Sequence, residues 1–238
     1  MLVNGDAKAL EWYCALILSG DQVGIQEWMN GEDQHTDNQR RFNLPSRLVA
    51  KTFLFRIIYG GGSYGFASDP NFGNIGGESF WQEAIDAFYD KYKGIHSWHK
   101  RLVDLVIKFG YFRIPCGRIY RFDQRKVAAN PGFWRPKILN YGVQGFGAYL
   151  MALARIGFWK IYKETTPELK SLLINTVHDS ILVDSPEEEC YNISTIMKRA
   201  FEEVPDSFEM YFNYDLALPM RAEISIGKDW SSLKEITI

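Results

Sequence analysis

Residues 47–60 read RLVAKTFLFRIIYG, and this stretch guides the interpretation of the whole chain. Arg47, Lys51, Phe55 and Tyr59 recur every four residues, so on an α-helix they form one stripe along one face. The stripe would be about 18 Å long, roughly the length of a nucleoside triphosphate. Cations near a helix N-terminus favour phosphate, and the aromatic rings farther along suit a sugar and a base. An amphipathic core helix with two solvent-reaching cations fits the same spacing, which leaves both interpretations open.

The composition describes a globular chain without overall basic character. Its 238 residues allow one or two domains, and 46% hydrophobic and 15% aromatic residues suffice for a packed core. The formal net charge is −2, so affinity for nucleic acid has to come from local clusters. The 3 cysteines are widely separated, which argues against a disulfide framework or a zinc cluster and suits a reducing cytosol. No apolar run near the N-terminus is long enough to span a membrane, and we expect no membrane partner.

Two carboxylates far apart in the sequence are candidate metal ligands, although the first of them, Asp6, also fits the N-cap of a helix. Residues 1–3 are apolar and could form a short strand, which Asn4-Gly5 is expected to end. Asp6 follows directly. Asp179 lies between two apolar runs within residues 172–183, a pattern that predicts a buried hairpin with a polar turn. A buried Asp is costly unless it binds a cation or a partner. Two such carboxylates could hold Mg²⁺, which prefers oxygen ligands and substrate phosphates.

Periodicity and punctuation predict the remaining elements. The expected elements are a helix over 11–29 with a break at 19–21, a flexible glycine-rich loop over 61–76, a helix over 78–109, a β-hairpin over 110–122, a helix over 134–162, and a helix over 187–203.

Several of these patterns together resemble the family A DNA polymerases, the DNA polymerase I type. The stretch R-x3-K-x3-F-x3-Y-G resembles motif B, Asp6-x4-Glu11 resembles motif A, and His178-Asp179-Ser180 resembles motif C. Asn140-x3-Gln144-Gly and the closing G-x-D-W at 227–230 also match, in the order of the family. The resemblance covers essentially the whole chain.

The resemblance implies an α+β fold. Its palm would combine an antiparallel sheet with helices, and a helical fingers subdomain would be inserted into it, with thumb and exonuclease absent. The implied boundaries are palm over 1–12, fingers over 13–115 with the motif B helix at 46–60, and palm again over 116–238 with motif C at 177–180.

The resemblance also implies roles for individual residues. Catalysis would rest on Asp6, Asp179 and Lys51. Two Mg²⁺ ions, for which Mn²⁺ can substitute, would be held by Asp6, the backbone carbonyl of Ala7, and Asp179. The incoming nucleotide would be bound by His35, Arg47, Lys51, Phe55, Tyr59 and Glu11. DNA would be contacted by Asn140, Gln144, His178 and Arg118. Ser180 stands where the family usually has an acidic residue, so the implied metal site relies on two carboxylates.

The implied function is template-directed DNA synthesis, in which a dNTP is joined to a primer 3′-hydroxyl. The implied partners are primer–template DNA, dNTPs, and an upstream polypeptide carrying the thumb and the rest of the palm. We therefore expect the C-terminal part of a split or truncated, phage-like polymerase, located in the cytoplasm, or in the host cytoplasm if the source is viral.

Two other readings of the sequence stay open. Single-subunit RNA polymerases share the R-x3-K…Y-G helix and commonly have His-Asp-Ser in motif C. Glu11 argues for DNA, because RNA polymerases need a small residue there to admit the ribose 2′-hydroxyl, and Phe55 and the G-x-D-W ending point the same way. The other alternative is a non-catalytic fragment that binds DNA or a protein partner.

Overall fold

The computed structural model describes residues 1–72, 74–165 and 169–238, and it divides into two compact units. Unit 1 comprises Met1–Leu10 and Phe146–Ile238, and unit 2 comprises Glu11–Gly145. Unit 2 is therefore an insertion in chain order. Residues 116–145, which the sequence assigned to the second palm segment, lie in the same compact unit as residues 11–115.

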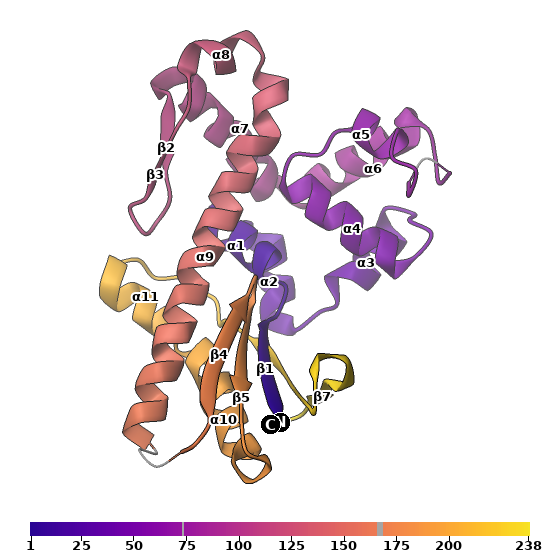
Figure 1. Cartoon of the computed structure of the whole chain (residues 1–238). Helices are drawn as coiled ribbons and strands as arrows, with labels where there is room; N and C mark the ends of the chain where they lie inside the picture. The colour runs from indigo at the N-terminus through magenta and orange to yellow at the C-terminus, as the bar shows by residue number, and fades with distance from the viewer. Residues whose placement is uncertain (73, 166–168) are drawn as a thin grey trace. The chain divides into compact units, whose positions relative to one another are not determined.

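Unit 1 contains a five-stranded antiparallel sheet (Figure 1). Its strands are β1 (Leu2–Ala7), β4 (Leu172–Val177), β5 (Ser180–Asp184), β6 (Ala222–Gly227) and β7 (Lys234–Ile236), in the spatial order β4-β5-β1-β6-β7. β1 is the central strand and pairs with β5 on one side and β6 on the other. The predicted α+β class is confirmed.

Helices accompany this sheet. They are the C-terminal part of α9 (Pro131–Thr165), α10 (Cys190–Glu202) and α11 (Val204–Phe212), with short 3₁₀ turns at Glu187–Glu189 and Trp230–Ser232. α10 packs on β1 and β6. A Cβ on Gly5 would lie 2.4 Å from Cγ of Met197 on α10, so only glycine allows this close approach. The prediction that Asn4-Gly5 ends the strand is wrong, because both residues lie inside β1.

The hairpin predicted over 172–183 is present, but one of its strands is not buried. β4 lies at the sheet edge, and Leu172 and Ile174 are exposed. β5 has neighbours on both sides and is buried along most of its length. The apolar run of β4 therefore misled the burial prediction, since residue type alone does not distinguish an edge strand from a central one.

Unit 2 is mainly helical (Figure 1). Its elements are α1 (Leu10–Ser19), α2 (Gln22–Asn30), α3 (Gln34–Arg41), α4 (Arg47–Ile58), α5 (Ser63–Ala67), α6 (Glu78–Lys91), α7 (Lys93–Phe109), the hairpin β2 (Tyr111–Arg113) and β3 (Ile119–Arg121), α8 (Gln124–Ala129), and the first part of α9. The break at 19–21 and the hairpin over 110–122 are confirmed. The segment 61–76 contains the short helix α5, and its residue 73 lies outside the described residues.

The helix predicted over 78–109 is two helices that meet at Tyr92. Tyr92 is fully buried, and its hydroxyl donates to Glu27 Oε2 at 2.8 Å. The periodicity continues across the break because both helices bury apolar side chains, so the periodicity did not indicate the break. None of the helices in the described part of the chain is long and apolar enough to cross a membrane.

Candidate functional site

The predicted stripe lies on the less buried side of α4. Ser46 caps the helix by accepting a hydrogen bond from the Val49 backbone amide at 3.2 Å. Arg47 and Lys51 are exposed and Phe55 is half-buried, whereas the opposite side of the helix, with Phe53 among its members, is buried. The cations therefore stand in the first turns of the helix, as the sequence predicts.

α3 adds a histidine to this stripe. The carboxylate of Asp33 caps α3 by accepting from the backbone amide of His35 at 3.1 Å, and it also accepts from Nε of Arg47 at 2.8 Å. The ring of His35 lies 6.3 Å from that of Phe55, and the Lys51 ammonium lies 5.8 Å from the Phe55 ring centre. The structure thus brings together His35, Arg47, Lys51 and Phe55, four of the six residues predicted to bind nucleotide.

The electrostatics of this cluster suit an anionic ligand. Burial and the neighbouring charge of Arg47 lower the pKa of His35 below its ordinary value, with Asp33 opposing them. The hydrogen bond from Arg47 holds the pKa of Asp33 far below its usual range. Among the described residues, nothing hydrogen-bonds to the buried Nδ1 of His35. A phosphate at this surface would meet the two exposed cations of α4.

The other end of the stripe forms a second group. The side-chain amide of Gln144 on α9 donates to the Tyr59 hydroxyl at 2.7 Å. Burial and then the negative charge of Glu11 raise the pKa of Tyr59 well above its ordinary value. Glu11 and Tyr59 therefore lie near each other. Gln144, which was predicted to contact DNA, is here engaged with Tyr59.

Two further residues predicted to contact DNA also belong to unit 2. Arg118 is exposed beside β3, and its guanidinium lies 5.4 Å from the Tyr120 ring. Asn140 lies one helical turn before Gln144 on α9, half-buried. A Cβ on Gly145 would lie 1.7 Å from the Tyr120 hydroxyl, so glycine is required where the hairpin meets α9. This close approach gives the glycine of N-x3-Q-G a physical reason.

The two predicted catalytic carboxylates belong to unit 1, Asp6 in β1 and Asp179 in the turn between β4 and β5. Asp6 is opposite Ser180 in the pairing of β1 with β5, and the Ala7 amide donates to the Asp179 carbonyl at 2.8 Å. Both carboxylates are half-buried, and His178 beside them is exposed with a positive φ of 54°. Asp6 and Asp179 therefore stand at the same end of adjacent strands, an arrangement that fits a magnesium site.

The residue after Asp179 is not a metal ligand in this arrangement. Ser180 is buried, and its hydroxyl donates to the Val177 carbonyl at 3.0 Å. Within residues 1–72, 74–165 and 169–238, no three His, Cys, Asp or Glu side chains gather as a metal-binding group. A metal in unit 1 would thus rely on two carboxylates, backbone oxygen and substrate.

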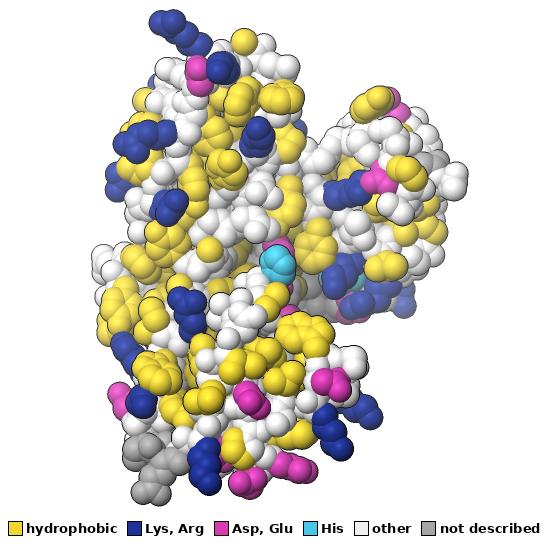
Figure 2. Space-filling model, in the orientation of Figure 1, with side chains coloured by type: hydrophobic (Ala, Val, Ile, Leu, Met, Phe, Trp, Pro, Cys, Tyr) yellow, Lys and Arg dark blue, Asp and Glu magenta, His cyan; other side chains and the backbone are white. Residues whose placement is uncertain are grey.

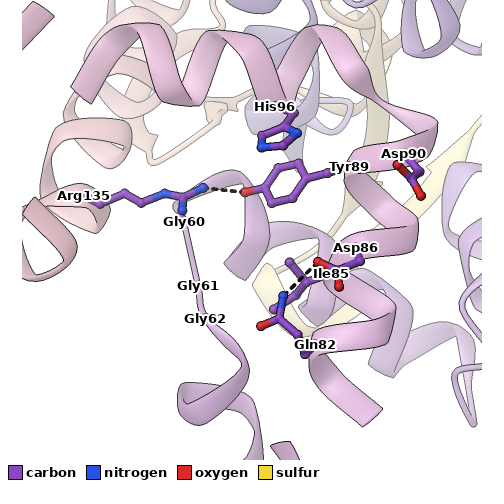
Figure 3. A pocket seen from close by; sticks show the side chains of 10 residues that line it. All are labelled: Gly60, Gly61, Gly62, Gln82, Ile85, Asp86, Tyr89, Asp90, His96 and Arg135. Atoms are coloured by element: carbon purple, nitrogen blue, oxygen red, sulfur yellow. Dashed lines mark hydrogen bonds between the residues drawn. The ribbon is translucent and has the colours of Figure 1, made fainter. Parts of the chain in front are cut away.

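A polar cavity of about 400 Å³ in unit 2 follows the C-terminal end of α4 (Figure 3). Residues 60–62 form one side, and α6, α7 and α9 contribute Tyr89, His96 and Arg135. Arg135 donates to the Tyr89 hydroxyl at 2.8 Å, and the Tyr89 ring stacks on His96 with centres 4.5 Å apart. Tyr89 also lies 3.0 Å from Nδ1 of the buried His99. Single, widely spaced residues form this network, so no sequence pattern indicated it.

Comparisons with known proteins identify the family of the chain. The chain matches the sequence profile of DNA polymerase family A over residues 1–232, and it belongs to that family. It is similar to a thermostable DNA polymerase I from Thermus aquaticus, with 25% identity over 246 residues that cover 99% of this chain and 27% of the relative. It is also similar to DNA polymerase I from Borreliella burgdorferi, with 26% identity over 98% of this chain and 25% of the relative.

A solved structure supports the fold. The POL domain of Pol1 from M. smegmatis, in complex with DNA primer-template and dNTP, superposes with a TM-score of 0.80 at 21% identity. The match covers 98% of this chain and 40% of that one. The chain thus spans about a quarter of the length of the curated relatives named here and less than half of the solved domain.

Proposed function

We propose that the chain carries out template-directed DNA synthesis, transferring a nucleotide from a dNTP to the 3′-hydroxyl of a DNA primer. The observation that carries the proposal is the cluster of His35, Arg47, Lys51 and Phe55 in a chain of family A. The proposed partners are primer–template DNA and dNTPs, because the related Pol1 domain is described in complex with both.

In this proposal Arg47, Lys51 and His35 bind the triphosphate. The two cations neutralise the charge that the β- and γ-phosphates gain as pyrophosphate leaves, and the imidazole contributes a hydrogen bond; such catalysis is mainly positioning and electrostatics. Phe55 offers a flat surface to the sugar and base. His35 stays neutral near pH 7 because its pKa is lowered, so it can donate one hydrogen bond without adding a third full charge.

Asp6, the Ala7 carbonyl and Asp179 would hold two Mg²⁺ ions, or Mn²⁺ in their place. When bound, the ions lower the pKa of the primer 3′-hydroxyl and neutralise the pyrophosphate. These residues would supply oxygen ligands from β1 and from the turn that precedes β5. His178 on the same turn, together with Asn140 and Arg118, is proposed to contact DNA.

Glu11 favours DNA synthesis over the RNA polymerase alternative. Its carboxylate is close enough to Tyr59 to raise the pKa of that phenol, and it would occupy the space of a ribose 2′-hydroxyl. A single-subunit RNA polymerase needs that space open. We therefore assign the sugar-discriminating role to Glu11 and Tyr59.

The remaining part of the polymerase domain is proposed to act with this chain, because the chain covers 40% of the related POL domain. An upstream polypeptide would carry the thumb and the rest of the palm. The site of action would be the cytoplasm, or that of the host if the source is viral.

Equilibrium dialysis with labelled dATP and Mg²⁺ tests the nucleotide-binding step directly. Lys51→Ala is expected to weaken binding by about tenfold or more, since a charge-assisted contact contributes on the order of 1.5–3 kcal/mol. Lys228→Ala, which removes an exposed lysine of unit 1, serves as the matched control. Equal binding by the two variants would refute the assignment of the cluster to the triphosphate.

A further inference from the structure

One segment of unit 2 has a charge opposite to that of the whole chain. Residues 93–137 contain 11 Lys and Arg but 2 Asp and Glu, a formal charge of +9 in a protein of net charge −2. All but one of these cations are exposed. Figure 2 shows dark blue side chains gathered over the lobe formed by α7, α8 and the β2–β3 hairpin. Such a concentration is unfavourable by self-repulsion, and it is typical of a surface that meets a polyanion.

The cations of α7 line a shallow groove of about 390 Å³. Lys100, Arg101 and Lys108 lie along it, with Asp104 between them, so the groove has a net charge of +2. The eight helical steps from Lys100 to Lys108 span about 12 Å, close to three or four nucleotide steps of about 3.4 Å along a stacked strand. The groove therefore follows a linear array of phosphates better than a single compact anion.

Aromatic rings stand at the end of this groove. Phe109 is 51% exposed, and the Lys108 ammonium lies 5.1 Å from its ring centre. Tyr111 is 44% exposed, with its ring 6.4 Å from that of Phe109. Exposed rings beside cations are the features by which proteins bind unpaired bases without sequence preference.

α8 extends the charged surface and is fixed to the same end of α7. The Gln124 side-chain amide donates to the carbonyls of Ile107 and Lys108 at 2.9 and 2.8 Å. Arg125 and Lys126 follow it and are exposed. These hydrogen bonds fix the start of α8 at the C-terminal end of α7, so little ordering entropy is lost when a strand binds there.

We propose that the groove on α7, with Lys100, Arg101, Lys108 and Phe109, binds single-stranded DNA, the cations contacting phosphates and Phe109 stacking on a base. The site adds to the proposed function and shares no residue with the nucleotide-binding cluster. Two sources of this ligand are chemically equivalent, namely the unpaired template ahead of the primer and a strand displaced from a duplex. An acidic segment of a protein partner is the competing occupant, and the exposed rings favour DNA over it.

Fluorescence anisotropy with a labelled oligothymidylate of about 16 nucleotides, without dNTP or metal, tests the proposal on the full chain. The triple variant Lys100→Gln, Arg101→Gln, Lys108→Gln is compared with a control of equal charge, Lys163→Gln, Lys228→Gln, Lys234→Gln, whose sites are exposed in unit 1. The slope of log K, where K is the binding constant, against log salt concentration is expected to be shallower by about 2 in the groove variant. Each phosphate contact on a single strand contributes about 0.7 to that slope, and the variant removes three cations. At 0.1 M salt this corresponds to about 100-fold weaker binding.

Phe109→Ala is expected to weaken binding by about fivefold or more and to leave the salt slope unchanged, because stacking releases no counterions. Two primer–templates, one with a long 5′ template overhang and one with a displaced flap, then show which single strand occupies the groove. The groove variant should bind less well to the substrate that carries that strand. An unchanged salt slope in the groove variant, or an equal loss in the control variant, would overturn the proposal. Neither result depends on dNTP binding, so failure here is distinguishable from failure of the proposed function.

Discussion

Replacement of Lys91 by methionine is expected to destabilise unit 2 strongly. The Lys91 side chain is 4% exposed, and its ammonium lies 2.8 Å from Glu27 Oε1 and 2.6 Å from Asp37 Oδ2. Glu27 is almost as buried, whereas Asp37 is 49% exposed and contributes little through its own pairing. The variant would leave the Glu27 carboxylate buried, where it still accepts a hydrogen bond from the Tyr92 hydroxyl at 2.8 Å.

The expected size of this effect follows from that uncompensated charge. Removing one partner of a buried ion pair costs about 3–5 kcal/mol. Urea unfolding followed by tryptophan fluorescence measures it, since five of the seven tryptophans lie in unit 2. Lys93→Met, two residues away and exposed, is the control and is expected to change stability by less than about 0.5 kcal/mol.

A double variant tests the physical reason. Combining Lys91→Met with Glu27→Gln removes the buried negative charge and keeps an acceptor for Tyr92, so part of the lost stability should return. A loss below about 1 kcal/mol for Lys91→Met, or no recovery in the double variant, would refute the reasoning that an unpaired carboxylate dominates.

Three further predictions concern other parts of unit 2. Gly145→Ala is expected to destabilise the chain by about 1–3 kcal/mol, because its Cβ would collide with the Tyr120 hydroxyl, and adding Tyr120→Ala should restore most of the loss in urea unfolding. Burial lowers the pKa of His99 to about 3, so the folded state binds fewer protons than the unfolded one between that value and about 6.5. Stability should therefore fall by about 2 kcal/mol on acidification from pH 6.5 to 5, and His99→Gln should reduce that dependence. Glu11→Ala is expected to raise ribonucleotide incorporation in primer extension, and an unchanged ratio of ribonucleotide to deoxyribonucleotide would remove Glu11 from sugar discrimination.

The sequence indicated those features that depend on short-range patterns. The four-residue repeat placed Arg47, Lys51 and Phe55 on one side of α4 because helix geometry alone determines that placement. The apolar runs around Asp179 gave the hairpin, and the motif order gave the family and the α+β fold. Each of these motifs and repeats is itself encoded by a few neighbouring residues.

The sequence-based predictions missed features that depend on tertiary contacts. Gly5 reads as a turn signal in the sequence, yet it lies in the central strand because a helix crosses there. The break falls at Tyr92, two residues before Gly94, where a buried hydrogen bond joins Tyr92 to Glu27, 65 residues away in the sequence. The ion pair of Asp33 with Arg47 was likewise unforeseen, although the D-x-H-T sequence could have suggested Asp33 as a helix cap.

The most direct test of the proposed function is primer extension with Mg²⁺ and the four dNTPs, using the wild-type chain and Asp179→Asn, each alone and with a polypeptide carrying the rest of the polymerase domain. We predict that the wild type adds the nucleotides that the template specifies, and that chelation of Mg²⁺ or the Asp179→Asn substitution abolishes the addition. Extension that survives in Asp179→Asn, extension that ignores the template, or none by the wild type under either condition would contradict the account.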